Sequence, residues 1–153
     1  MKKSFLIVII GMLSLGMSMN SCSSDDKDET DSRDQYVGAW VMVSEGTVNT
    51  LFNGDIEETE IVNETETVNI SKSGENDLLI DGRVYSVNGF NLTSTPYANP
   101  FDEGEYTGSI IFTTIGVLSS DTITLQSDVT GTWSYDGNDG TFNGNVVHTL
   151  SKM

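Results

Sequence analysis

The side chains best suited to chemistry in this 153-residue chain are its single cysteine, Cys22, and its single histidine, His148. Cys22 cannot form a disulfide within the chain, so its position directly after an apolar N-terminal segment needs another explanation. His148 alternates with Val146 and Leu150, which predicts a strand face that packs in the core rather than a general base. Because no Gly-x-Ser-x-Gly motif is present either, we expect no catalytic residues and no enzyme activity.

The chain has few side chains that could bind a metal ion. A zinc site needs three or four His, Cys or carboxylate ligands, and the chain has one histidine and one cysteine. The loop from Asp136 to Gly140 resembles the start of an EF-hand, but its last glycine stands too early and no glutamate closes the loop. An acidic ridge lies on one face of a predicted strand and consists of Glu58, Glu60, Glu64 and Glu66. Such a ridge is more typical of a solvated face or a protected strand edge than of a cation site. We expect no metal and no cofactor.

Binding is the function that remains, and the chain offers two candidate sites for it. The interior of a barrel would hold a small apolar ligand or be filled by side chains, and its predicted lining includes Trp40, Ile110, Phe112 and Trp133. Exposed aromatic faces around a proline-containing segment could instead stack on a glycan, and these are Tyr97, Phe101 and Tyr106. The alternative is a non-catalytic protein-docking or envelope-structural role without a ligand cavity.

The elements that must position these residues are β-strands throughout. From Tyr36 onward, apolar residues alternate with Thr, Ser and Asn, and no stretch has the spacing of an amphipathic helix. Hairpins are predicted at Asn53-Gly54, Asp81-Gly82, Asn88-Gly89 and the 136–140 loop, whereas 95–105, which holds both prolines, predicts a long shaped loop. The candidate strands, some of which should merge, are 37–48, 55–71, 77–80, 83–87, 90–94, 106–118, 121–127, 131–135 and 141–151.

Short sequential hairpins favour an all-β, antiparallel up-and-down meander of about eight strands that closes into a barrel, with a β-sandwich as the alternative. In a closed barrel the first and last strands must pair, since pairing removes the two sheet edges. We therefore expect 37–43 to lie beside 146–150, with Trp40 buried.

Residues 1–21 have the features of a signal peptide. Lys2 and Lys3 precede an apolar stretch from Phe5 to Leu15, which is shorter than the ~20 residues of a membrane-spanning helix. Met19-Asn20-Ser21-Cys22 resembles a lipobox, with methionine where leucine is commoner, and this implies that Cys22 becomes an N-acyl diacylglyceryl cysteine. The chain would then be held at a membrane by its lipid anchor.

The residues after Cys22 indicate where that anchor holds the protein. The segment Ser23–Glu29 resembles the acidic export signal of Bacteroidetes surface lipoproteins, which implies an outer-membrane protein that faces the cell exterior. Residues 22–34 contain almost no apolar side chain and are expected to form a disordered acidic tether, with the folded domain at 35–153. Without the leader, five basic residues face twenty-three acidic ones, a net charge of −18 that excludes nucleic acid as a partner.

The first predicted strand carries a family resemblance. Gly38-Ala39-Trp40, after Gln35-Tyr36-Val37, resembles the Gly-x-Trp that opens the first strand of lipocalins, although Gly131-Thr132-Trp133 matches the same short pattern. Together with the meander it resembles the small lipocalin-like lipoproteins of the Bacteroidetes over 36–150. The resemblance implies a barrel with Trp40 at its floor, while the basic residue that stacks on that tryptophan in lipocalins has no clear counterpart.

Overall fold

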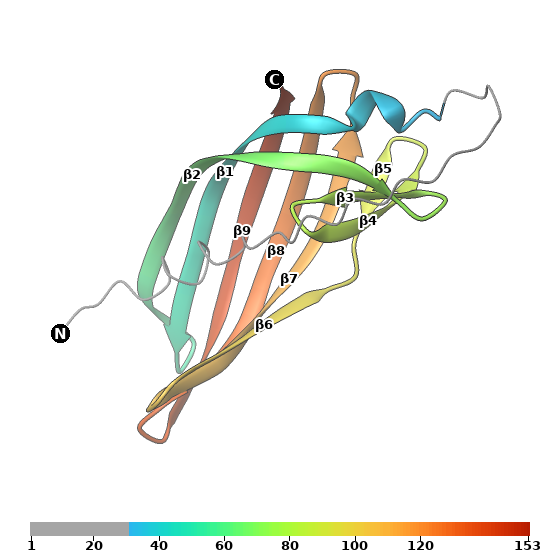
Figure 1. Ribbon diagram of the computed structural model, residues 1–153. Helices are drawn as coiled ribbons and strands as arrows, with labels where there is room; N and C mark the ends of the chain where they lie inside the picture. Colours follow the sequence, from blue (N-terminus) through green and yellow to red (C-terminus); the bar gives the residue numbers. More distant parts are fainter. Residues whose placement is uncertain (1–30) are drawn as a thin grey trace.

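The computed structural model describes residues 31–153, so the predicted signal peptide, Cys22 and residues 23–30 of the tether lie outside the described residues. A short 3-10 turn, η2 (Asp34–Tyr36), precedes nine strands of one antiparallel sheet (Figure 1). The strands are β1 (Gly38–Phe52), β2 (Asp55–Ser73), β3 (Asp77–Ile80), β4 (Arg83–Asn88), β5 (Asn91–Thr93), β6 (Tyr97–Glu103), β7 (Tyr106–Leu118), β8 (Thr122–Tyr135) and β9 (Asn138–Lys152). The predicted all-β, antiparallel up-and-down fold is confirmed.

The sheet closes into a barrel-like ring at two places. The first strand pairs with the last, from Trp40 opposite Lys152 to Phe52 opposite Gly140, as the sequence predicts for a closed meander. On the other side of the ring, β5 pairs with the C-terminal part of β7, with Asn91 opposite Val117. Strand β6 pairs with the remaining part of β7, so the two short strands share one edge of a long one.

One expected merger of candidate strands is found, and one prediction about an individual element is wrong. The candidate strands 121–127 and 131–135 form one continuous strand, β8, because Asp128 to Thr130 continue the alternation of buried and exposed side chains. The segment 95–105 is not a long loop, since most of it forms β6 even though Pro100 lies inside that strand, opposite Ser109. Strand β6 pairs on one side only, and an edge strand tolerates proline because its free side needs no N–H donor.

Tight turns join most neighbouring strands. Asn53-Gly54, Asp81-Gly82 and Asp136-Gly137 each have two successive positive φ angles, the conformation of the type I′ turns that connect twisted antiparallel strands. The last of these turns is shorter than the predicted 136–140 loop, so β9 begins earlier than expected, at Asn138. Glycines also allow strands to approach closely inside the ring. A Cβ atom at Gly46 would collide with the backbone of Asn145 on β9.

The barrel interior contains two separate apolar clusters. The closed-end cluster lies beside η2 and consists of Tyr36, Trp40, Met42, Val68, Ile70, Leu78, Ile80, Tyr85, Leu92, Leu118, Ile123, Leu125 and Leu150. The open-end cluster lies toward the other end and consists of Val48, Val62, Ile110, Phe112, Val129, Trp133, Phe142 and Val146. Between them the inward positions are polar, so the core does not run the whole length of the barrel.

The wall of the barrel is interrupted beside the open-end cluster. Strand β3 pairs with β2 only between Ile70 and Ser73, so among the described residues the outer edge of 55–69 has no neighbouring strand. The free edge of β6 lies across the gap, in the lower half of the view in Figure 1. The acidic ridge lies on this stretch of β2, on the same strand face as the buried residues Val62 and Val68. It therefore faces inward, and its carboxylates keep contact with solvent because the wall is open beside them.

Candidate functional site: a polar pocket inside the barrel

A small pocket opens from the barrel interior at the level where the two apolar clusters separate. Its volume is about 60 Å³, enough for a few water molecules or for the polar end of a larger ligand. Residues from β1, β2, β8, β9 and the β3–β4 hairpin line it: Met42, Ser44, Glu64, Glu66, Ile80, Asp81, Arg83, Tyr85, Leu125 and His148. Most of these side chains are polar or charged, which is unusual for the inside of a small barrel.

A chain of hydrogen bonds fixes the imidazole of His148 at one wall of the pocket. Nδ1 lies 2.8 Å from Ser44 Oγ, and Nε2 lies 3.2 Å from Ser127 Oγ. Ser127 is in turn hydrogen-bonded to Thr114 Oγ1 at 2.8 Å, and both hydroxyl groups are buried. These four residues are the polar layer. Burial, with a smaller contribution from the positive charge of Arg83, lowers the pKa of His148 to about 4, so the ring is neutral at neutral pH.

Arg83 supplies the positive charge in the lining of the pocket. Its Cζ atom lies 4.6 Å from the centre of the Tyr97 ring and 5.4 Å from that of Phe112, within range of cation–π attraction. The guanidinium also interacts with the hydroxyl group of Tyr85, whose pKa burial raises. Its Nη2 atom is buried and has no hydrogen-bond partner among the described residues. An unpaired buried donor is costly, so this atom marks a place where an acceptor is missing.

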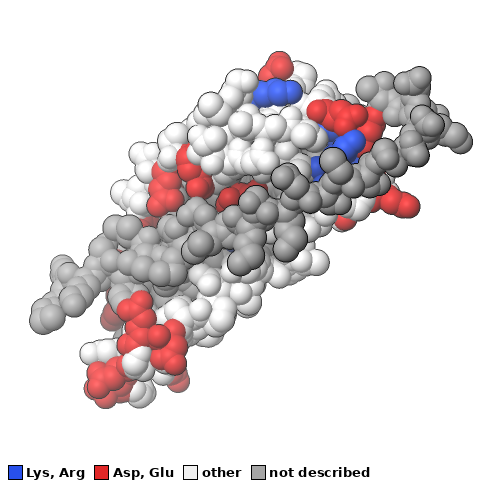
Figure 2. Space-filling view, viewed as in Figure 1, with Lys and Arg blue, Asp and Glu red and all other residues white. Residues whose placement is uncertain are grey.

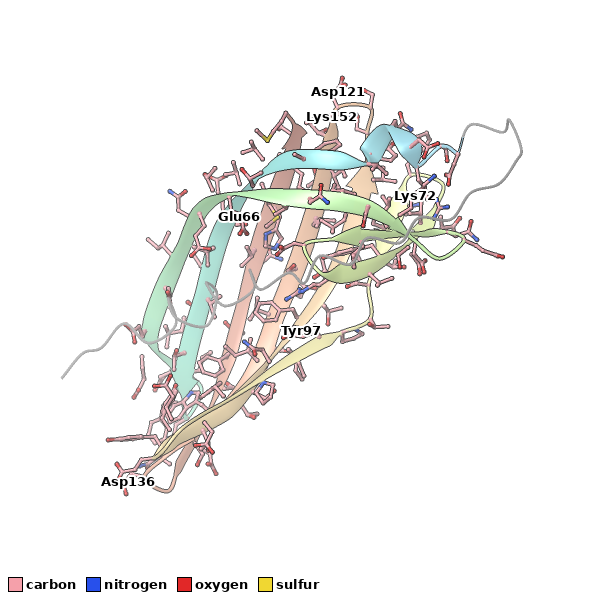
Figure 3. The ribbon with its side chains drawn as sticks, viewed as in Figure 1. Glu66, Lys72, Tyr97, Asp121, Asp136 and Lys152 are labelled. Carbon is pink, nitrogen blue, oxygen red and sulfur yellow. The ribbon has the colours of Figure 1, made fainter. Side chains whose placement is uncertain are left out.

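Carboxylates line the pocket beside the polar layer, since Glu64 on β2 lies opposite Ser44 in the β1–β2 register and Ser44 lies opposite His148 in the β1–β9 register. Glu64 and Glu66 on β2 and Asp81 in the β3–β4 turn all line the pocket. Partial burial, reinforced by Asp81 and Glu64, raises the pKa of Glu66, and burial raises the pKa of Asp81 against the attraction of Arg83. Figure 3 labels Glu66 on β2 and Tyr97 on β6, on the two strands that border the gap. The pocket thus offers carboxylate acceptors together with the guanidinium donor of Arg83.

The residues predicted to line an apolar cavity do not come together around one. Trp40 is fully buried in the closed-end cluster, where its Nε1 donates a 2.9 Å hydrogen bond to the carbonyl of Tyr36. Ile110, Phe112 and Trp133 belong to the open-end cluster. Of these four, only Phe112 approaches the pocket, through its contact with Arg83. The structure places all four as core residues that fill the two halves of the barrel.

The three predicted glycan-stacking aromatics divide between two places. Tyr97 is 42% exposed and stacks on Arg83 at the edge of the pocket. Phe101 stacks on Tyr106, with ring centres 5.3 Å apart, and Tyr106 stacks on Trp133 at 5.9 Å. Phe101 and Tyr106 therefore pack against the open-end cluster, and Tyr97 alone has a ring available beside the pocket.

Most of the pocket residues were not predicted from the sequence, although two signals pointed to them. The acidic ridge alternates with the same parity as Val62, Val68 and Ile70, which places both sets on the core side of β2. Arg83 likewise alternates with Tyr85 and Val87 on a strand that follows directly on a tight turn. Charged side chains in phase with core residues indicate a polar interior, and this pattern is visible in the sequence.

The described part of the chain places limits on other interpretations of the site. Within residues 31–153, no group of three or more His, Cys, Asp or Glu side chains is arranged to hold a metal ion. None of the helical structure in this range is long and apolar enough to cross a membrane. The arrangement can bind a polar molecule through hydrogen bonds and charges. Neither the protein-family models nor the curated proteins searched contain a match to this chain.

Proposed function

We propose that this chain is a non-catalytic, lipid-anchored binding protein of the bacterial cell surface that captures the end of a glycan in the interior pocket. The observation that carries the proposal is the polar pocket itself, inside a barrel whose wall is open beside it. Carboxylates, a guanidinium and hydroxyl groups are the partners that sugar hydroxyls need. We also propose that the chain is related to the lipocalin-like lipoproteins that its first strand resembles.

The lining favours a glycan over a small apolar ligand. The apolar residues of the interior are taken up by two packed clusters, and the remaining space is bordered by Glu64, Glu66, Asp81 and Arg83. An apolar ligand in this pocket would strip water from these charges without replacing it. The half-exposed ring of Tyr97 adds a surface on which a sugar could stack at the entrance.

The distribution of charge supports anchoring through the end of the domain that carries η2. Arg33, Lys72 and Lys152 gather there, and Lys72 Nζ lies 2.6 Å from Asp34 while Lys152 donates to the carbonyl of Gln35. The opposite tip carries acidic hairpin residues, visible as the red group at the lower left of Figure 2. A tether from Cys22 that enters at Asp31 would direct this acidic tip away from an anionic membrane.

Anchoring is tested by the substitution Cys22→Ala. In cells that carry this variant the protein should leave the membrane fraction and lose its acyl mass, because the proposed acyl chains are its membrane attachment. Deletion of 23–29 should keep acylation but make the protein inaccessible to protease added outside intact cells. Membrane retention of Cys22→Ala would contradict the lipid anchor, and unchanged protease access after the deletion would contradict surface export.

Ligand capture is tested with the purified lipoprotein in detergent, first by native mass spectrometry for a carried molecule and then on a glycan array. Arg83→Gln and Tyr97→Ala should each weaken binding by about tenfold or more, as expected for a lost charged hydrogen bond or a lost stacking surface. Ile61→Ala is the matched control, since Ile61 is 75% exposed on the outer face of β2. If all three variants bind the ligand as tightly as the wild-type protein does, the pocket is not the binding site.

A second candidate function is protein docking, which one surface feature favours. The outer face of β7 exposes Ile111, Ile115 and Val117 at 39%, 57% and 54%, beside uncharged residues of β8 such as Thr124 and Gln126. This apolar stripe is uncharged in a strongly acidic protein. If the chain docks a protein here, Ile115→Asp should abolish capture of that protein in a pull-down, and Arg83→Gln should leave the capture intact. If the chain captures a glycan instead, Arg83→Gln should weaken glycan binding and Ile115→Asp should not.

A further inference from the structure

The interior pocket contains carboxylates without a counter-ion and a hydrogen-bond donor without an acceptor, and one ligand could satisfy both. Glu64, Glu66 and Asp81 line it without a counter-ion, since the ion pairs within 4.0 Å among residues 31–153 involve only Arg33 and Lys72 as cations. Arg83 also lines the pocket, is held over aromatic rings and keeps a buried Nη2 atom without an acceptor. Three carboxylates and one guanidinium leave the pocket with a net negative charge, because His148 is neutral at neutral pH.

The position of Arg83 explains why the protein does not neutralise these carboxylates itself. Its guanidinium interacts with the rings of Tyr97 and Phe112 and with the hydroxyl group of Tyr85, and among the described residues it forms no ion pair within 4.0 Å with a carboxylate. Arg83 attracts Asp81, but the carboxylates of β2 still repel one another. Glu66 has a raised pKa through partial burial and through Asp81 and Glu64, as does Glu60 next along the ridge, through burial and through Glu58 and Glu64. A bound cation would relieve this repulsion.

The cation must belong to a molecule rather than be a single metal ion. Within the described residues these carboxylates are not grouped closely enough to coordinate one ion. A pocket of about 60 Å³ accommodates an ammonium group with one or two hydroxyl groups, but not a whole sugar ring. The rest of such a ligand would extend through the gap between β2 and β6, past Tyr97, along the remaining glutamates of the ridge.

We infer that the ligand end captured in the interior pocket carries a protonated primary amine beside its hydroxyl groups, as the unacetylated residues of an aminoglycan do. The ammonium group lies against Glu66, in the negative field of Glu64 and Asp81, and a ring or hydroxyl oxygen accepts a hydrogen bond from Arg83 Nη2. Repeating amines along the chain meet Glu60 and Glu58 where the ridge continues toward the open end. This inference rests on the proposed glycan-binding function and specifies its ligand class.

Two trisaccharides that differ only in acetylation test the inference. Isothermal titration of the lipoprotein in detergent at pH 7 compares a β-1,4-linked glucosamine trimer with the N-acetylglucosamine trimer. We expect the free amine form to bind at least tenfold more tightly, and we expect Glu66→Gln to reduce that preference to less than threefold. Glu45→Gln is the matched control, because Glu45 is an exposed glutamate on β1, and this variant should keep the full preference. Asp81→Asn repeats the test from the other carboxylate element in case Glu66→Gln does not fold.

The outcomes separate the inference from the proposed function. If acetylated or neutral glycans bind as tightly as the amine and still depend on Arg83, the inference is wrong and glycan capture stands. If the amine binds tightly but Glu66→Gln, Asp81→Asn and Glu45→Gln all keep the preference, the interaction comes from overall negative charge and the inference is also wrong. If neither trisaccharide binds and no array glycan depends on Arg83, both the inference and the proposed function fall.

Discussion

The two ends of the barrel solve the same packing problem in different ways. At the closed end, β1 to β5 and β7 to β9 pair all the way round, and η2 adds Tyr36 beneath Trp40, so thirteen buried residues form one cluster. At the open end, β2 and β6 leave edges unpaired, the cluster is smaller, and aromatic rings such as Phe101 and Tyr106 pack against it from the rim. The pocket lies where one arrangement gives way to the other.

This difference assigns different physical roles to the two ends. A fully paired wall with an apolar centre supplies stability, since every buried backbone group has a partner and apolar area is removed from water. An interrupted wall with inward carboxylates gives up some of that stability and leaves part of the interior open to solvent. The polar layer of Ser44, Thr114, Ser127 and His148 separates the two roles, because its members satisfy one another by hydrogen bonds.

Removal of the last strand should have the largest effect. A chain that ends after Gly140 loses almost all of β9, which pairs with both β1 and β8 and closes the wall on the side opposite the gap. The whole domain should unfold instead of losing one strand, and circular dichroism and thermal melting should show no cooperative transition. Deletion of the exposed Met153 alone is the control and should leave the transition intact. A cooperative melt in the truncated chain would contradict the closed ring.

The substitution Trp40→Ala should have the next largest effect. Trp40 is fully buried in the closed-end cluster, and a truncation of this size in a packed core costs ~3–5 kcal/mol in the free energy of unfolding. Urea titration of the variant measures the loss. Tyr97→Ala provides the comparison at the open end. Because Tyr97 is 42% exposed, its removal should cost less than ~1.5 kcal/mol, and a similar loss for both variants would show that the two ends do not differ in this way.

The sequence predicted the closed end better than the open end for a physical reason. The Asp81-Gly82 hairpin turn depends on local φ preferences, and the alternation of Ile123 and Leu125 with polar residues depends on a period of two, so both can be recognised from neighbouring residues. Pairing of the first and last strands then followed from closure. These features needed no knowledge of distant contacts.

The open end depended on contacts that local patterns do not encode. Pairing of β6 with β7 overrode the two prolines that suggested a loop. The acidic ridge faces a gap because β3 does not pair with β2 beyond Ile70. The position of the ridge on the core side of the strand could have been inferred from Val62 and Val68. The pocket arises where β1, β2, β8, β9 and the β3–β4 hairpin come together, so its lining residues could be established only once the ring was assembled.

The two tryptophans offer a matched test of a smaller effect. Trp40 Nε1 donates to the carbonyl of Tyr36, whereas Trp133 Nε1 is buried and has no partner among the described residues. Replacement by phenylalanine removes similar volume at both sites, but only Trp40→Phe leaves a carbonyl without its donor. Trp40→Phe should therefore destabilise the protein by about 1–2 kcal/mol more than Trp133→Phe in urea titrations. Equal losses would mean that the Trp40 hydrogen bond contributes nothing to the closed end.

The smallest expected effect concerns pH and the polar layer that divides the two ends. The pKa of His148 is about 4 in the folded chain, below the ordinary 6.5, because burial and Arg83 oppose the charged ring. Between these two values the unfolded chain binds a proton at His148 that the folded chain does not, so the free energy of unfolding falls as the pH decreases from about 6.5 toward 4. The raised pKa values of Glu66 and Asp81 act in the opposite direction, since the folded chain takes up those protons first.

His148→Gln isolates the histidine contribution from that of the carboxylates. Glutamine can still hydrogen-bond to Ser44 or Ser127 but does not titrate, and the carboxylates are common to both proteins. Between pH 7 and pH 5 the wild-type protein should lose about 1 kcal/mol more than the variant, after allowance for the partial exposure of the ring, which corresponds to ~5 °C in melting temperature. If the melting temperatures of the two proteins change equally with pH over this range, His148 is already hydrated in the folded state. The polar layer would then be continuous with the gap instead of sealing the closed end from it.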